Sequence, residues 1–143
     1  MSTPKIVTPE EAAALLAQGY TYVDVRSEPE FEAGHPAGAL NVPISHATPT
    51  GMQPNPEFLS VVEQSFGKDD KLVIGCKSGG RSKRAAALLT SAGFTQVVDM
   101  GPGWDGSRDA FGRLTPGWSA SNLPKEVGSS ERQSYAGVKQ RKA

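Results

Sequence analysis

The sequence contains one cysteine, Cys76, within residues 73–82 (VIGCKSGGRS). The apolar run at 72–74 predicts a buried strand, and residues 83–89 predict a helix. A lone cysteine is more often buried and inert than reactive. Here the two glycines, the cations Lys77 and Arg81 and the start of a helix favour a reactive thiolate, because backbone N–H groups converge at a helix N-terminus.

Short strand and helix signals alternate along the chain and would position this cysteine. Strands are predicted at 6–7, 20–25, 40–43, 72–74 and 95–100. Helices are predicted to begin near Pro9, Ser27, Asn55 and Lys83. The alternation is typical of an α/β fold with a largely parallel sheet and helices on both faces.

Three segments carry weaker signals. Residues 44–56 are rich in proline, threonine and glycine and are predicted to form a long loop. Residues 105–112 are predicted to be helical. We expect one domain over residues 1–125, followed by a polar, flexible tail at 126–143.

Asp24 and Arg26 lie at the end of the strand predicted at 20–25. Ligands bind at the carboxyl ends of strands in open α/β sheets, so this pair could support a site there. A weak ion pair at a strand end is an equally good interpretation. His35 follows in a loop, where a lone histidine is more often structural than catalytic.

The composition excludes several classes of function. The formal net charge is zero, which gives no case for a nucleic-acid or membrane partner. One cysteine excludes an internal disulfide, a redox pair and a cysteine-based zinc site, and two distant histidines predict no other metal site. With no apolar signal region, we expect a cytoplasmic protein, or one of an organelle stroma or matrix if a transit peptide has been removed.

Four motifs, in this order and spacing, resemble the rhodanese-like sulfurtransferases. They lie at residues 24–26 (DVR), 30–35 (EFEAGH), 38–43 (GALNVP) and 76–82 (CKSGGRS), and the similarity covers residues 5–124. The sequence is most similar to the single-domain thiosulfate sulfurtransferases of plants and bacteria. The resemblance implies a rhodanese-like fold with a central, mostly parallel, five-stranded sheet.

The resemblance also implies a ping-pong transfer of sulfur through a persulfide on Cys76, with no other cofactor. The thiolate attacks thiosulfate, and the sulfur then passes to cyanide or to a thiol, which includes a protein thiol. The acceptor must be external because the chain has no second cysteine. The implied substrate-binding residues are Lys77, Ser78, Gly79, Gly80, Arg81 and Ser82.

Chemistry gives these loop residues different tasks. Gly79 and Gly80 allow the positive φ angles of a tight ring of N–H groups, which stabilises a sulfur anion. Lys77 is expected to attract the anionic donor, and Arg81 either joins it or turns back to Asp24 to hold the loop, the interpretation that we favour. Ser82 would cap the helix or donate to the sulfur.

The chain departs from the family near its end, where residues 105–117 look inserted between two family motifs. This insertion leaves open whether Trp104 or Trp118 lies near the site.

Three alternatives remain. Phosphatases and arsenate reductases of this fold have a longer loop, whereas four residues separate Cys76 from Arg81 here. A rhodanese-like binding or regulatory module without chemistry usually lacks the cysteine. Enzymes that use mercaptopyruvate tend to have an uncharged loop, so Lys77 and Arg81 favour thiosulfate.

Overall fold

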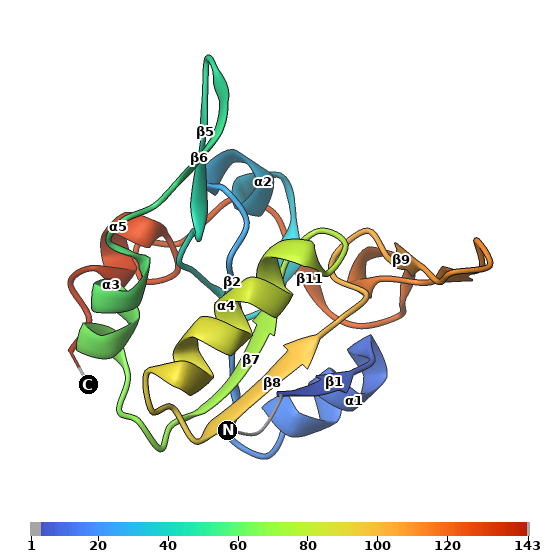
Figure 1. The fold of residues 1–143 in the computed structure, drawn as a ribbon, viewed down its shortest axis with the longest axis horizontal. Helices are drawn as coiled ribbons and strands as arrows, with labels where there is room; N and C mark the ends of the chain where they lie inside the picture. The colour runs from blue at the N-terminus through green and yellow to red at the C-terminus, as the bar shows by residue number, and fades with distance from the viewer. Residues whose placement is uncertain (1–3, 143) are drawn as a thin grey trace.

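The computed structural model describes residues 4–142, with a parallel sheet at its centre (Figure 1). Its strands lie in the order β1-β8-β7-β2-β4, and every neighbouring pair is parallel. In that order they are β1 (Lys5–Val7), β8 (Gln96–Met100), β7 (Lys71–Gly75), β2 (Thr21–Asp24) and β4 (Leu40–Asn41). The five predicted strands and the α/β fold class are confirmed.

Helices cover both faces of the sheet. They are α1 (Pro9–Leu16), α2 (Glu28–Ala33), α3 (Phe58–Ser65), α4 (Gly80–Ser91), α5 (Tyr135–Val138) and the 3₁₀ turn η1 (Trp118–Ala120). Successive strand residues point to opposite faces. Val23 and Ile74 therefore enter one core with α3, α4 and α5, while Tyr22 and Val73 enter the other with α1, α2 and η1.

Local sequence signals explain where the first helices begin. The Thr8 hydroxyl accepts from the N–H of Glu11, and the Glu11 carboxylate accepts from the N–H of Thr8, which forms a capping box at the start of α1. At α2 the Glu30 carboxylate likewise accepts from the N–H and hydroxyl of Ser27. The predicted caps at both positions are confirmed.

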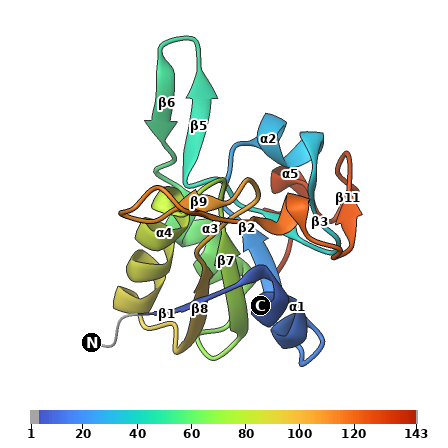
Figure 2. The same cartoon turned by 90° about the vertical axis from the view of Figure 1, so that its right-hand side faces the viewer.

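A hairpin replaces the long loop predicted at 44–56. β5 (Ser45–Thr48) and β6 (Gly51–Pro54) pair antiparallel and project away from the body of the protein (Figures 1 and 2). All four residues of β6 are exposed. The prediction of a loop is wrong because an exposed strand needs no alternation of apolar and polar residues.

A second small hairpin replaces the helix predicted at 105–112. β9 (Ser107–Arg108) and β10 (Leu114–Thr115) pair antiparallel. The Asp109 carboxylate accepts from the N–H groups of Phe111 and Arg113, which shapes the turn. Gly106, inside the predicted helix, has a positive φ of 96°, which is incompatible with a continuous helix over these residues.

The segment after residue 125, predicted to be a flexible tail, contacts the rest of the fold as far as Arg141, which donates to the Ser65 carbonyl at the end of α3. β11 (Lys125–Glu126) pairs antiparallel with β3 (His35–Pro36), and the Gln133 carbonyl accepts from the N–H of Asn41 on edge strand β4. Tyr135 and Val138 of α5 are buried in the core on the α3 and α4 side. The segment docks because it pairs with a sheet edge and because docking buries these two apolar side chains of its own.

The same segment contributes to the surroundings of His35. The His35 ring is fully buried and stacks on Phe31, with Nδ1 2.8 Å from the Phe31 carbonyl and Nε2 3.3 Å from a Glu126 oxygen. These contacts support the structural role expected for this histidine. Among residues 4–142, no helix is long and apolar enough to cross a membrane.

Candidate active site

Cys76 lies between the end of β7 and the start of α4. Its side chain is 2% exposed, and its Sγ accepts a hydrogen bond from the N–H of Gly79 at 3.1 Å. The Ser82 hydroxyl lies 3.5 Å from the same sulfur. The Gly79 N–H aimed at the sulfur is suited to stabilise negative charge on it, whereas the Ser82 hydroxyl accepts from the thiol and donates to the Gly79 carbonyl at 3.3 Å.

Two glycines give the loop its shape. Gly79 has a φ of 105°, and a Cβ there would lie 2.6 Å from the Gly101 carbonyl oxygen. A Cβ on Gly75, at the end of β7, would overlap the hydroxyl of Tyr22. Gly80 differs from the prediction, because it lies in α4 without a positive φ and with open space around its Cα.

The segment that follows β8, with Trp104 and Asp105, holds the other side of the loop, and we call it the strap. The N–H of Trp104 donates to the Cys76 carbonyl at 2.8 Å, and the N–H of Asp105 donates to the Lys77 carbonyl at 2.9 Å. The carboxylate of Asp105 also lies 3.8 Å from the Lys77 ammonium. Position 105 therefore holds the main chain of Lys77, while its carboxylate lies near the exposed ammonium without a hydrogen bond.

Arg81 turns away from Asp24, contrary to the interpretation favoured from the sequence. Its two terminal nitrogens donate to the two Glu30 oxygens at 2.7 and 2.9 Å, a bidentate pair that ties α4 to α2. The hydrogen bonds from Arg81 lower the pKa of Glu30 to about 2. Arg81 does hold the loop, but through Glu30, whereas Asp24 is already occupied by Arg26.

Asp24 and Arg26 form a buried pair below the loop. Their side chains are 0% and 3% exposed, and Arg26 Nη2 lies 2.7 Å from Asp24 Oδ2. Burial lowers the pKa of Arg26, but the hydrogen bond and charge of Asp24 outweigh it and hold that pKa above its ordinary value. The Arg26 guanidinium lies 5.2 Å from the centre of the Trp104 ring. The pair thus supports the loop indirectly, through Trp104.

The two tryptophans have separate places. Trp104 contacts Arg26 and belongs to the strap, so it is the tryptophan beside the site. Trp118 is 1% exposed and packs edge-on against Tyr22 in the core on the α1 side.

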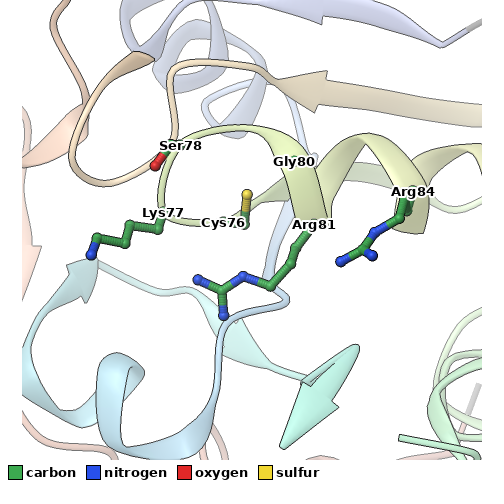
Figure 3. A pocket seen from close by; sticks show the side chains of 6 residues that line it. All are labelled: Cys76, Lys77, Ser78, Gly80, Arg81 and Arg84. Atoms are coloured by element: carbon green, nitrogen blue, oxygen red, sulfur yellow. The ribbon is translucent and has the colours of Figure 1, made fainter. Parts of the chain in front are cut away.

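An open pocket of about 580 Å³ lies over the sulfur. We call it the Cys76 pocket; it is lined by Cys76, Lys77, Ser78, Gly80, Arg81 and Arg84. Figure 3 shows the side chains of Lys77 and Arg84 on opposite sides of Cys76, with Arg81 between them. The structure therefore brings the predicted residues 76–82 together around the sulfur, with Asp24 and Arg26 below.

Sequence reasoning missed three participants, namely Arg84, Glu30 and Asp105. Arg84 could have been found, because residues three apart on a helix share a face and Arg81 was already assigned to the loop. The acidic residues gave no such signal. Their basic partners are far away in sequence and meet them only through the fold.

Comparison with known proteins places this arrangement in a family. Residues 8–110 match the family described as "Rhodanese-like domain". The chain is 40% identical over 124 residues to thiosulfate sulfurtransferase 16, chloroplastic, of Arabidopsis thaliana, covering 87% of this chain and 94% of that protein.

Two further likenesses extend this result. The chain is 46% identical over 119 residues to the senescence-associated protein DIN1 of Raphanus sativus, covering 82% of this chain and 59% of that protein. The crystal structure of Rv0390 from M. tuberculosis superimposes with a TM-score of 0.73 at 29% identity, covering 89% of this chain and all of that one.

Proposed function

The chain belongs to the rhodanese-like domain family, and on that premise we propose that it transfers a sulfane sulfur from thiosulfate to cyanide or a thiol through a persulfide on Cys76. The observation that carries the proposal is the position of the sulfur. Cys76 Sγ receives the Gly79 N–H at the base of a pocket that Lys77, Arg81 and Arg84 line with positive charge.

In the first half-reaction the Cys76 thiolate attacks the sulfane sulfur of thiosulfate. The new S–S bond forms as the bond to the sulfonate sulfur breaks, and sulfite leaves with that electron pair. The persulfide carries the negative charge on its outer sulfur. The Gly79 N–H supports this step, since it already donates to the sulfur, and the Ser82 hydroxyl, 3.5 Å from the sulfur, can turn from the Gly79 carbonyl to donate to it.

In the second half-reaction an acceptor anion takes the outer sulfur. Cyanide attacks it, the S–S bond of the persulfide breaks, thiocyanate forms and the Cys76 thiolate returns. A thiolate acceptor leaves as a persulfide in the same way. Cys76 is the only cysteine, so the acceptor comes from outside the chain. Neither half-reaction needs a group other than the two substrates and the sulfur.

The intact mass of the reduced protein tests the proposal. After incubation with thiosulfate we expect the gain of one sulfur atom, lost again with release of thiocyanate when cyanide is added. Cys76→Ser should neither gain the sulfur nor form thiocyanate, while keeping the circular dichroism spectrum of the native protein.

Thiocyanate formation by the serine variant would exclude the persulfide on Cys76. A native protein that gains no sulfur from thiosulfate, mercaptopyruvate or a persulfide donor would instead be a binding module of this family.

A further inference from the structure

The three cations of the Cys76 pocket differ in what neutralises them. Arg81 is 17% exposed and uses both terminal nitrogens on the Glu30 carboxylate. Lys77 is 56% exposed, and its nearest carboxylate, that of Asp105, is 3.8 Å away, beyond hydrogen-bond distance. Arg81 is thus committed to a structural pair, and Lys77 is held loosely.

Arg84 is the third cation, and it is exposed. Within residues 4–142, its guanidinium makes no ion pair and no side-chain hydrogen bond. It follows Arg81 by three residues on α4, so both side chains leave the same face of the helix and reach the pocket (Figure 3). All five N–H donors of this guanidinium are open to a ligand.

We propose that Arg84 is a specificity-determining residue that binds the anionic end of the sulfur donor at the Cys76 pocket. The inference rests on the proposed function, and it divides the cations into two groups. Arg84 and Lys77 bind the oxyanion from opposite sides of the sulfur, while Arg81 fixes the loop.

The chemistry of the donor fits this division. Thiosulfate is a dianion whose sulfonate oxygens point away from the sulfur that is transferred. When the sulfane sulfur faces Cys76, the oxygens lie toward the mouth of the pocket, where Arg84 and Lys77 are placed. A planar guanidinium binds such oxygens through two parallel N–H donors, which an ammonium group cannot do.

Three substitutions on α4 test the assignment by steady-state kinetics at low ionic strength. Arg84→Ala should raise the KM for thiosulfate about tenfold and leave kcat within about twofold, because a charge-assisted pair at the mouth is lost and the loop is not. The KM of Arg84→Lys should lie between those of the native protein and Arg84→Ala, since lysine keeps the positive charge but lacks the two parallel N–H donors of the guanidinium.

Lys83→Ala is the matched control. It removes one positive charge from the next position on the same helix, and Lys83 is exposed but does not line the Cys76 pocket. Its KM should stay within about twofold of the native value. Equal effects of Arg84→Ala and Lys83→Ala would overturn the inference, since net charge alone would then explain them.

A second measurement is independent of sulfur transfer. Cys76 is alkylated with iodoacetate, an anion, and with iodoacetamide, which is neutral and of nearly the same size. Arg84→Ala should lower the ratio of the iodoacetate rate to the iodoacetamide rate several-fold, whereas Lys83→Ala should not. An unchanged ratio in Arg84→Ala would refute the anion-binding role.

The two measurements separate the two proposals. If the native protein gains no sulfur from thiosulfate and the alkylation ratio still falls in Arg84→Ala, the proposed function fails and the anion-binding role of Arg84 stands. If the native protein gains sulfur and neither KM nor the ratio responds to Arg84→Ala, the function stands and this inference fails.

Discussion

The charged side chains below the loop at residues 76–82 differ in burial and in bonding from those at the mouth of the Cys76 pocket. Asp24 and Arg26 are almost fully buried and bond one another, while Lys77 and Arg84 are exposed and largely unbonded. A buried charge must be matched inside the protein, because the cost of removing it from water is otherwise not recovered. An exposed charge stays hydrated and remains available to a ligand. Arginine therefore occurs in both regions, buried and paired as Arg26 and exposed as Arg84.

Removing one member of the buried pair should have the largest effect on stability. Asp24→Asn leaves the Arg26 charge buried without its carboxylate, so we expect a loss of about 3–5 kcal/mol in the free energy of unfolding. Urea unfolding followed by circular dichroism measures it.

The matched control is Glu63→Gln, which breaks the exposed pair between Glu63 and Lys68. It should cost less than about 1 kcal/mol. If both variants lose the same stability, burial does not distinguish the two regions and the comparison fails.

The partly buried pair of Arg81 and Glu30 should show an intermediate effect that depends on pH. The pKa of Glu30 is lowered from 4.5 to about 2 by its bonds to Arg81. A carboxylate with a lowered pKa stabilises the fold above its unfolded value, and that stability is lost as the pH falls from about 4.5 toward 2.

We therefore expect Glu30→Gln to cost about 1–2 kcal/mol at pH 7, after allowance for screening by solvent. The difference from the native protein should shrink as the pH approaches 2, in unfolding curves measured at both ends of this range. A difference that does not change with pH would show that Glu30 acts through packing and not through its charge.

The smallest effects should come from the loosely held pair at the mouth. Lys77→Ala should raise the KM for thiosulfate a few-fold, because one exposed cation leaves the pocket. Asp105→Asn should lower it by up to about twofold, since Lys77 is then released toward the donor.

The two substitutions should thus change the KM for thiosulfate in opposite directions, and KM measured at several salt concentrations tests this. Both effects should fade as salt rises. Asp105→Asn that raises KM would mean that the carboxylate positions Lys77 and does not compete for it.

The sequence predicts those parts of the fold that depend on local signals. The apolar run at 72–74 and the caps at Thr8 and Ser27 each carry their information within a few residues, and their elements appear where expected. The thiol of Cys76 was placed correctly for the same reason, because a strand, a glycine loop and a helix are continuous in the chain.

Contacts between distant segments explain what could not be predicted. The exposed residues of β6 have no alternation to detect, and α5 has only two large apolar side chains, those of Tyr135 and Val138. The partner of Arg81 was missed because Glu30 lies on another helix. The sequence favoured Asp24 as the partner of Arg81, and only the fold shows that Arg26 occupies Asp24.

The docked segment after residue 125 has a consequence for how the protein is made. The buried Tyr135 hydroxyl accepts from Asn55 Nδ2 at 3.0 Å, and Val138 is fully buried in the same core as residues of β2 and β7. During synthesis, β2 and β7 therefore leave the ribosome before Tyr135 and Val138, which complete their core, have been added to the chain. During that interval the outer edge of β4 lacks the Gln133 carbonyl that later accepts from the N–H of Asn41, and an unpaired strand edge of this kind is prone to aggregation.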